Sequence, residues 1–372
     1  MSGKLISMIW QFVNLDLKTI SIFVYQNIIT ISISLLAILA LFVFKCFISL
    51  IKVLCKNRNW YGVAQRKKQQ FDDLCTNLAK KDFYKFYSIP KNKEELILQS
   101  DAQDLLKLLK TRKVTSVELV NFYTKRCLDK AVSLNLVTDF LYDEAIEKAK
   151  SADKLYEQFK NDPNWVPKKL LGLPISLKDA FYLKGHDTTL GTATQAFKPS
   201  EKNGYIIDVL EDNGAIPFVV SNVSQFMNSY ETNNPIWGRA MNPWNKDRST
   251  GGTSGGEAGL ISYGCSPLGI ATENQGGIRV PALACGVYGY KSSFRRVLNE
   301  GVKYNFTEQW NHFTCIGPLT RSVRDIELVM DVIADATNIQ AKGYYQMAPI
   351  PWKSEKVETS GKTIKKFGYI KE

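Results

Sequence analysis

A long uncharged stretch near the N-terminus constrains this chain most. No charged residue occurs between Thr19 and Phe44, and the most apolar part, from Ile28, reads IITISISLLAILALFVF. About 20 apolar residues suffice to cross a hydrocarbon core roughly 30 Å thick, so the stretch is long enough to span a membrane. A cleaved signal peptide is the alternative, but it would have a shorter apolar run and a small-residue cleavage site. We therefore predict a retained single-pass transmembrane anchor over residues 19–55, after an N-terminal segment at 1–18.

The charge distribution predicts the orientation of that anchor. The formal net charge is +12. Basic residues follow the apolar stretch with no acid before Asp72: Lys45, Lys52, Lys56, Arg58, Arg66, Lys67 and Lys68. Basic flanks stay on the cytosolic or matrix side, so we expect the folded body there, in an endomembrane or the mitochondrial inner membrane. No basic and aromatic binding motif is present, so the expected partner is membrane lipid and not nucleic acid.

The cysteines and histidines limit which metal sites, disulfides and catalytic groups can be expected. Seven cysteines are scattered without a CxxC pair: Cys46, Cys55, Cys75, Cys127, Cys265, Cys285 and Cys315. A disulfide framework or a zinc site is therefore not expected, and we predict reduced thiols and no metal or other cofactor. His186 and His312 are the only histidines, which disfavours histidine-based catalysis.

The region after the anchor has helical signals. Residues 56–99 are charged and aromatic-rich and predict a helical linker. A capping box, Ser100 to Gln103, precedes LLKLLK, and a second, Thr115 to Glu118, precedes LVNFYTKRCLDKA. The next segment, NLVTDFLYDEAIEKAKSADKLYEQF, predicts a short strand and then a helix.

Beyond Pro167 the pattern changes to buried strands. Short apolar runs bounded by Gly, Pro or Asn read LLGLPISLKDAF, AIPFVVSNV and PLGIATE, and the helical stretch YIIDVLEDNG lies between two of them. Alternating strands and helices predict an α/β domain with a mixed or parallel sheet. The final TIKKFGYIKE predicts one more strand.

Three segments in order resemble one family. They are GLPISLKDAF with KGHDTTLGT, MNPWN with STGGTSGGEAGL, and PLGIATENQGGIRVP with CGVYGYK. Together they resemble the amidase signature, and MNPW, KGHD and the N-terminal anchor resemble its fatty-acid amide hydrolase branch. The resemblance runs over residues 100–372. It implies a truncated amidase-signature α/β fold with a mixed sheet, holding about the first half of the domain.

In that family a lysine, a serine on a cis peptide and a nucleophilic serine form the catalytic triad. A buried lysine can be neutral and act as a base through the bridging serine, while the second serine attacks the amide carbonyl. By position, the lysine matches Lys178, the bridging serine matches Thr253 beside Ser254, and the nucleophile matches Gly277. The family's Gly-Gly-Ser-Ile-Arg reads here Gln-Gly-Gly-Ile-Arg, and no Ser, Thr or Cys lies between Thr272 and Pro281.

The resemblance also assigns the surroundings of the triad. The loop whose N–H groups would hold an oxyanion comprises Asn274, Gln275, Gly276 and Gly277. The usual aspartate before this loop is Glu273, which we expect to pair with Arg279. Met227 matches a family position near the substrate site, but taken on its own the residue favours a core methionine.

The two hydroxyl residues have two interpretations. Thr253 or Ser254 is recruited as a replacement nucleophile, or both hydroxyls cap the following helix and bond loop N–H groups. We favour helix capping. Lys178 is then a relic base.

Three functions follow. Because glycine cannot attack a carbonyl, and loss of a nucleophile costs about 10⁶-fold in kcat, we expect a catalytically inactive amidase-like subunit of a membrane assembly. A protein partner would cover the sheet edge that the domain's second half completes in the family. The alternatives are an active membrane-bound amidase acting on lipid amides and an acyl-lipid-binding module.

Overall fold

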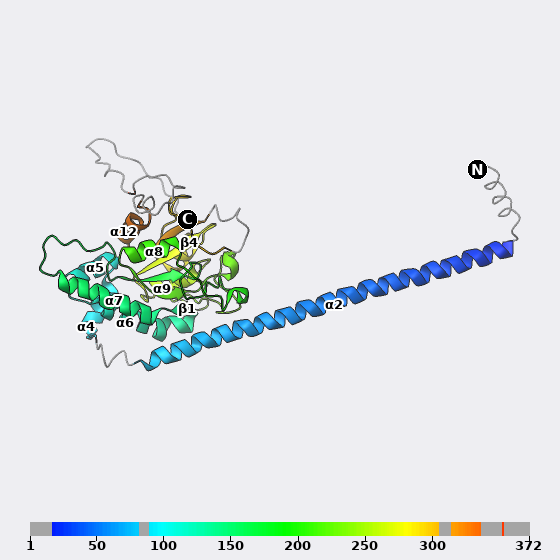
Figure 1. Ribbon diagram of the computed structural model, residues 1–372, viewed down its shortest axis with the longest axis horizontal. Helices are drawn as coiled ribbons and strands as arrows, with labels where there is room; N and C mark the ends of the chain where they lie inside the picture. Colours follow the sequence, from blue (N-terminus) through cyan, green and yellow to red (C-terminus); the bar gives the residue numbers. More distant parts are fainter. Residues whose placement is uncertain (1–16, 82–88, 305–313, 336–351, 353–372) are drawn as a thin grey trace, which may run out of the picture. The chain divides into compact units, whose positions relative to one another are not determined.

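The computed structural model describes residues 17–81, 89–304, 314–335 and 352 (Figure 1). The chain divides into two compact units, one ending at Trp60 and one beginning at Tyr61. The strand predicted in TIKKFGYIKE lies outside the described residues.

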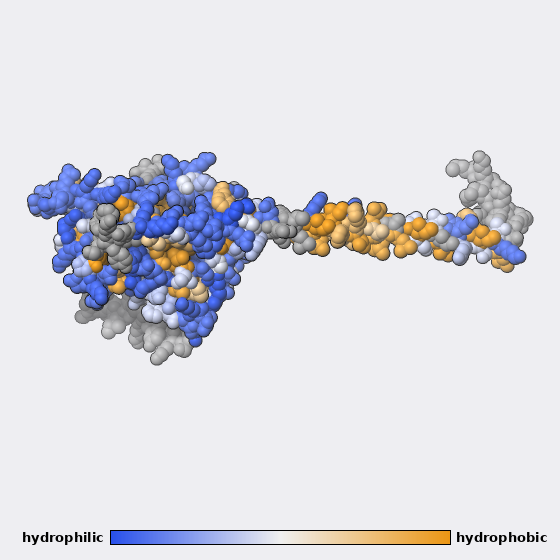
Figure 2. All heavy atoms as spheres, turned by 90° about the horizontal axis from the view of Figure 1, so that it is seen from below, coloured by the Kyte–Doolittle hydropathy of each residue, from blue (hydrophilic) through white to orange (hydrophobic). Residues whose placement is uncertain are grey.

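The uncharged N-terminal stretch is helical. α2 spans Leu17–Lys80 and continues through residue 55, where the sequence places the end of the anchor. The described large apolar side chains up to Val53 are exposed and give this part of the helix a hydrophobic surface (Figure 2). Among the described residues, Leu17–Val53 is the one segment long and apolar enough to cross a membrane. This criterion uses length and composition alone, and a signal sequence near an N-terminus also meets it.

From Tyr61 onward, α2 belongs to the second unit and has a buried face. Ala64, Phe71 and Leu78 are almost fully buried. Their spacing of seven residues places them on one side of a helix, two turns apart. This part of α2 therefore packs as an element of the folded body.

Among the described residues after α2, three helices precede the first strand in the chain and one follows it: α4 Lys91–Gln99, α5 Ala102–Lys110 and α6 Ser116–Arg126 come before, and α7 Tyr142–Gln158 comes after. The predicted helix after the second capping box does not continue as an α-helix to Ala131. A π-helical turn over Cys127–Ala131 and a 3₁₀ turn over Val132–Leu134 follow α6. The predicted strand and helix after them are confirmed as β1 and α7.

One of the two predicted capping boxes is present. Thr115 accepts a hydrogen bond from the Glu118 N–H, and the Glu118 carboxylate accepts one from the Thr115 N–H. The box predicted at Ser100 is wrong, because Asp101 caps α5 by accepting the Asp104 N–H at 3.0 Å. The Ser100 hydroxyl instead donates back to the carbonyl of Leu96.

A mixed sheet forms the centre of the body, as the strand pattern predicts. Its strands are β1 Val137–Phe140, β2 Pro174–Lys178, β3 Ile216–Ser221, β4 Leu268–Glu273, β5 Tyr288–Gly289 and β6 Cys315–Thr320. The order across the sheet is β1-β3-β2-β4-β6-β5. β2 runs parallel to both β3 and β4, while β1, β5 and β6 pair antiparallel with their neighbours. The carboxyl ends of β2, β3 and β4 therefore lie at one edge of the sheet.

Helices cover the sheet (Figure 1). The later ones are α8 Tyr205–Asp212, α9 Gly255–Ser262, α10 Arg279–Cys285 and α12 Val323–Ile333. α6 and α7 pack together and against β3, α8 packs against β3, α12 against β6, and α9 against β2, β4, β6 and α10. Every residue of β2, β3, β4 and β6 is buried, and burial on both faces explains why β2, β3 and β4 lie in short apolar runs of the sequence.

Candidate functional site

Lys178 lies at the carboxyl end of β2 and is fully buried. Its amine donates to the hydroxyl of Thr253 at 2.6 Å, to the hydroxyl of Thr272 at 3.0 Å and to the carbonyl of Thr272 at 3.2 Å. The structure thus brings two of the predicted site residues into direct contact. It also adds Thr272, the fifth residue of β4, which the sequence analysis does not identify.

The surroundings of Lys178 change its proton affinity. Burial lowers the pKa of its amine from 10.5 to about 7, although the carboxylates of Glu257 and Glu273 act in the opposite direction. A substantial fraction of a group with this pKa is neutral at neutral pH, and only the neutral amine can accept a proton. Lys178 therefore has the environment expected of a base.

Thr253 occupies the position predicted for the bridging residue. The Gly252–Thr253 peptide bond is cis. The Thr253 carbonyl accepts a hydrogen bond from the Ser224 N–H at 3.2 Å. With its hydroxyl bonded to Lys178, the threonine keeps the polar contact of a bridging hydroxyl.

Ser254 does not cap α9, contrary to the favoured interpretation of the two hydroxyls. It is the N-terminal flanking residue of the helix but makes no side-chain capping bond, and its buried hydroxyl donates to the carbonyl of Thr272 at 3.4 Å. The first helical N–H groups have other acceptors: the Gly255 N–H bonds Thr232 Oγ1, and the Gly256 N–H bonds the Asn222 carbonyl. Tertiary contacts have therefore replaced the local cap.

The predicted pair of Glu273 and Arg279 is present and closes the loop between β4 and α10. The buried Glu273 carboxylate accepts the Arg279 Nε–H at 2.7 Å and the N–H groups of Gly276, Ile278 and Arg279, each at 3.0 Å. Burial alone would raise the pKa of Glu273, but these donors hold it below the usual range. The Glu273 carboxylate, paired with Arg279, therefore stabilises the turn conformation of the loop between β4 and α10.

Gly277 stands at the position predicted for the nucleophile and has no side chain. A Cβ atom added there would lie 2.7 Å from Thr253 Oγ1 and 2.8 Å from the carbonyl oxygen of Thr272. Both distances are shorter than an ordinary van der Waals contact, so any side chain would need a shift of its neighbours. The packing around position 277 therefore accommodates a glycine and leaves no room for a larger residue.

Of the four predicted oxyanion-loop residues, Gly276 uses its N–H for Glu273. For the N–H groups of Asn274, Gln275 and Gly277 no acceptor is found among the described residues. Unpaired N–H groups beside a cavity can bind a carbonyl oxygen or an anion.

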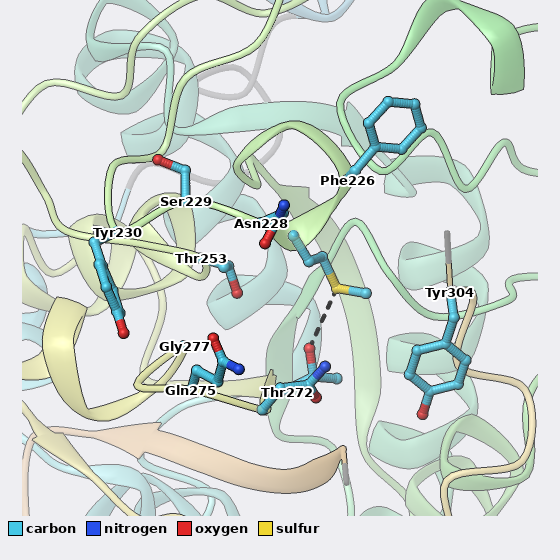
Figure 3. Close-up of a pocket in the computed structure, with 11 residues that line it drawn as sticks. Phe226, Asn228, Ser229, Tyr230, Thr253, Thr272, Gln275, Gly277 and Tyr304 are labelled. Atoms are coloured by element: carbon cyan, nitrogen blue, oxygen red, sulfur yellow. Dashed lines mark hydrogen bonds between the residues drawn. The ribbon is translucent and has the colours of Figure 1, made fainter. Parts of the chain in front are cut away.

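A cavity of about 390 Å³ opens beside these groups (Figure 3). Its lining comprises Phe226, Met227, Asn228, Ser229, Tyr230, Thr253, Thr272, Asn274, Gln275, Gly277 and Tyr304. In Figure 3, Tyr230 and Tyr304 lie on opposite sides of it. Thr253 and Gly277 reach the cavity, whereas Lys178 and Ser254 are not among its lining residues.

Met227 is placed on the cavity wall, where the sequence comparison with the family puts it. Its sulfur accepts a hydrogen bond from the Thr272 hydroxyl at 3.5 Å. Phe226 and Met227 both have φ of 56°, a left-handed conformation that non-glycine residues adopt rarely. Consecutive residues of this kind are typical of functional sites, where the surrounding structure holds them.

Glu257 is a site residue that the sequence analysis interprets only as an acid at a helix start. Its fully buried carboxylate accepts hydrogen bonds from the hydroxyls of Ser176 and Ser221. Gly269 makes room for it, because a Cβ there would overlap the carboxylate. Burial raises the pKa of Glu257 to about 7, against the hydroxyls and Lys178, which lower it. An acid within the small and apolar run GGEAGLIS was the available signal.

Comparisons with known proteins show which family the chain resembles over most of its length. The family model described as amidase matches residues 118–372. Amidase 1 of Gibberella moniliformis is 31% identical over 80% of this chain and 55% of its own length. Fatty acid amide hydrolase 1 of Caenorhabditis elegans is 32% identical over 83% of this chain and 52% of its own.

A solved fatty acid amide hydrolase has a TM-score of 0.69 and 25% identity, covering 80% of this chain and 55% of that one. The chain spans about half the length of the first curated relatives it matches.

Proposed function

This chain belongs to the amidase family, and from that premise we propose that it is a non-hydrolytic member that binds an acyl amide or a related lipid without cleaving it. Gly277 is the observation that carries the proposal, because it stands where the family has its attacking serine. Deleting the nucleophile of a serine hydrolase costs about 10⁶-fold in kcat and leaves only binding and oxyanion contributions.

The space around Gly277 supports the loss of the serine route. The structure has no free volume for a side chain at position 277, since Thr253 Oγ1 and the Thr272 carbonyl lie within 2.8 Å of a built Cβ. The adjacent Ser254 does not reach the cavity.

The cavity supports ligand binding. Phe226, Met227, Tyr230 and Tyr304 contribute to its wall, and three further lining residues, Asn274, Gln275 and Gly277, have backbone N–H groups with no acceptor among the described residues. A mostly apolar pocket with a few convergent polar groups is the usual form of a small-molecule site. An acyl chain with a carbonyl head group matches this distribution.

A second candidate function is slow hydrolysis with Thr253 as nucleophile. It is favoured by one observation: the Thr253 hydroxyl lines the cavity and lies 2.6 Å from the Lys178 amine. The threonine oxygen would bond the amide carbon while its proton passes to Lys178. The leaving amine would take that proton as the C–N bond breaks, and water would then hydrolyse the acyl-threonine.

A hydroxyl-directed fluorophosphonate probe distinguishes the two candidates. We expect the full chain in mild detergent to remain unlabelled under conditions that label an active serine amidase. Labelling that disappears in Thr253→Ala and in Lys178→Met, but persists in Ser254→Ala, would establish the second candidate and refute the first.

We also propose that α2 anchors the protein in a membrane and that the body acts as an accessory subunit there. The exposed apolar side chains of Leu17–Val53 and the basic flank after them support the anchor, with the body on the cytosolic or matrix side. Trp244, Leu283 and Tyr288 support a protein partner, because they are exposed by 74%, 86% and 50%.

These three residues belong to one region. The Trp244 indole donates to the carbonyl of Cys285 at the end of α10, and Tyr288 begins the edge strand β5. Exposed apolar groups beside a sheet edge are typical of protein interfaces. A native gel of mild-detergent membranes, with mass spectrometry of each band, should find the chain in a larger complex. Migration near its own mass would exclude a stable partner.

A further inference from the structure

We propose that Lys67 and Phe71 of α2 are positioning residues for the pocket. They act through residues 187–198, a segment that contacts both the residue after Lys178 and the pocket wall. The inference concerns the pocket of the proposed function, but its principal test requires neither ligand binding nor hydrolysis.

Phe71 is the central buried residue on the inner face of α2. Its ring packs edge-on against Trp237, with 5.6 Å between ring centroids, and stacks with Phe140 of β1 at 6.1 Å. The side chain is 4% exposed. An aromatic group this buried fills a volume that smaller side chains would leave partly empty.

Lys67, one turn earlier on the same side, makes the polar contact. Its amine lies 2.8 Å from the carboxylate of Asp187, and the two side chains are only 13% and 7% exposed. The amine also lies 5.5 Å from the centroid of the Phe197 ring. Removing one partner of a largely buried ion pair leaves the other charge without compensation.

Asp187 connects Lys67 to both ends of the segment formed by residues 187–198. Its carboxylate also accepts the N–H groups of Phe197 and Lys198, at 2.7 and 2.6 Å, and so joins the two ends of residues 187–198. Lys67 therefore stabilises the contact between the two ends of the segment. Phe71 packs against Trp237, whose indole bonds Thr189 within the same segment.

The Trp237 indole continues the contact toward Lys178. It donates to the Thr189 hydroxyl at 3.3 Å, and Thr189 in turn donates both its hydroxyl and its N–H to the buried Asp179 carboxylate. Asp179 is bonded to Lys178 in the chain. A shift of Trp237 would thus be transmitted to the end of β2 that carries the amine.

The same segment holds the opposite part of the pocket. The carbonyl of Leu190 accepts the N–H of Phe226 at 2.8 Å. Phe226 lines the cavity and has the left-handed backbone described above. Residues 187–198 therefore contact two parts of the site, and the inner face of α2 supports them.

Hydrogen exchange of the full chain in mild detergent, followed by mass spectrometry, tests the inference. In Phe71→Ala and Lys67→Met we expect peptides covering 187–198 and 224–230 to exchange about tenfold faster or more, because their Thr189 and Phe226 amide bonds open more often. Peptides of α6 should exchange as in wild type. Phe71→Leu and Lys67→Arg should restore most of the protection.

Gln69→Ala is the matched control, because Gln69 is exposed on α2 and bonds only Asp73 among the described residues. It should leave every peptide unchanged. The inference is overturned if 187–198 and 224–230 keep wild-type exchange in Phe71→Ala, or if all peptides, α6 included, accelerate together.

Binding of octadecanamide separates this inference from the proposed function. We expect Phe71→Ala to weaken binding about tenfold, and Gln69→Ala to leave it unchanged. If wild type does not bind octadecanamide while the exchange pattern appears as expected, the proposed function fails and the positioning role stands.

Discussion

Restoring a serine at position 277 should destabilise the protein, although it recreates the residue that the family uses. The Cβ of Gly277→Ser would lie 2.7 Å from Thr253 Oγ1 and 2.8 Å from the Thr272 carbonyl oxygen. Neither atom moves freely, because Lys178 holds the hydroxyl and the carbonyl belongs to β4. The substitution therefore overpacks a closed site.

Overpacking a well-packed interior typically costs about 1–3 kcal/mol. Because one of the two neighbours is backbone, we expect the upper half of that range. With an unfolding entropy of about 2.1 cal/mol/K per residue for the unit that begins at Tyr61, such a cost lowers Tm by about 3–5 °C. The added change Thr253→Ser should recover part of the loss, since serine lacks the methyl group and its hydroxyl can rotate away.

Thermal unfolding in detergent, followed by intrinsic fluorescence, measures this effect. Gly62→Ser is the matched control, because the nearest atom to its built Cβ is the end of the Arg66 side chain at 4.0 Å, and it should change Tm by little. A Gly277→Ser protein that unfolds at the same temperature as Gly62→Ser would refute the argument that the loop has closed around glycine.

Three further predictions follow from particular contacts. The pKa of Glu257 is about 7 in the folded state and 4.5 in the unfolded state, so between these pH values the folded state binds more protons. The free energy of unfolding of wild type, relative to Glu257→Gln, should therefore fall by about 3 kcal/mol as pH rises from 4.5 to 7. Chemical denaturation measures this difference. Asp101→Ala should cost about 1 kcal/mol by removing the α5 cap, whereas Ser100→Ala should cost less, and equal losses in urea titrations would contradict the assignment of the cap. The full chain should stay in the membrane pellet at alkaline pH, while a chain beginning at Tyr61 should be released, and release of both would refute the proposed anchor.

The central part of the fold follows from the sequence. β2, β3 and β4 are predicted because strands buried on both faces form short apolar runs with sharp boundaries. β6 is not identified, since Gly317 and Pro318 interrupt its pattern and both residues disfavour strands. β5 has only two residues and depends on pairing with β6.

The start of α5 shows why a local signal can be insufficient. Ser100 and Asp101 are both good capping residues, and Gln103 completes a box for the first of them. In the structure the Gln103 N–H bonds the buried carboxylate of Asp325, a residue 222 positions away. A contact so distant in the chain determines the cap and has no local sequence signal.

Some residues of the candidate site could be predicted from the sequence, whereas others could not. The amidase-signature motifs predict that Lys178, Thr253 and Gly277 lie together. In the structure Thr253 and Gly277 line the cavity, and the buried Lys178 amine bonds the Thr253 hydroxyl from behind them. Phe226 and Tyr304 come from other segments, and their place in the site depends on the packing of the chain. Thr272 lies in the same motif segment as Gly277, but only the structure shows that its hydroxyl contacts Lys178. Glu257 is hidden by its helical position, which suggests an exposed capping acid instead of a buried carboxylate.

Hydrolysis of octadecanamide by the purified full chain tests the central claim most directly. Release of octadecanoate, quantified by mass spectrometry, should be the same for wild type, Thr253→Ala and Lys178→Met, and no higher than without protein. Release by wild type that both substitutions abolish would contradict the account and establish the protein as a threonine-dependent amidase.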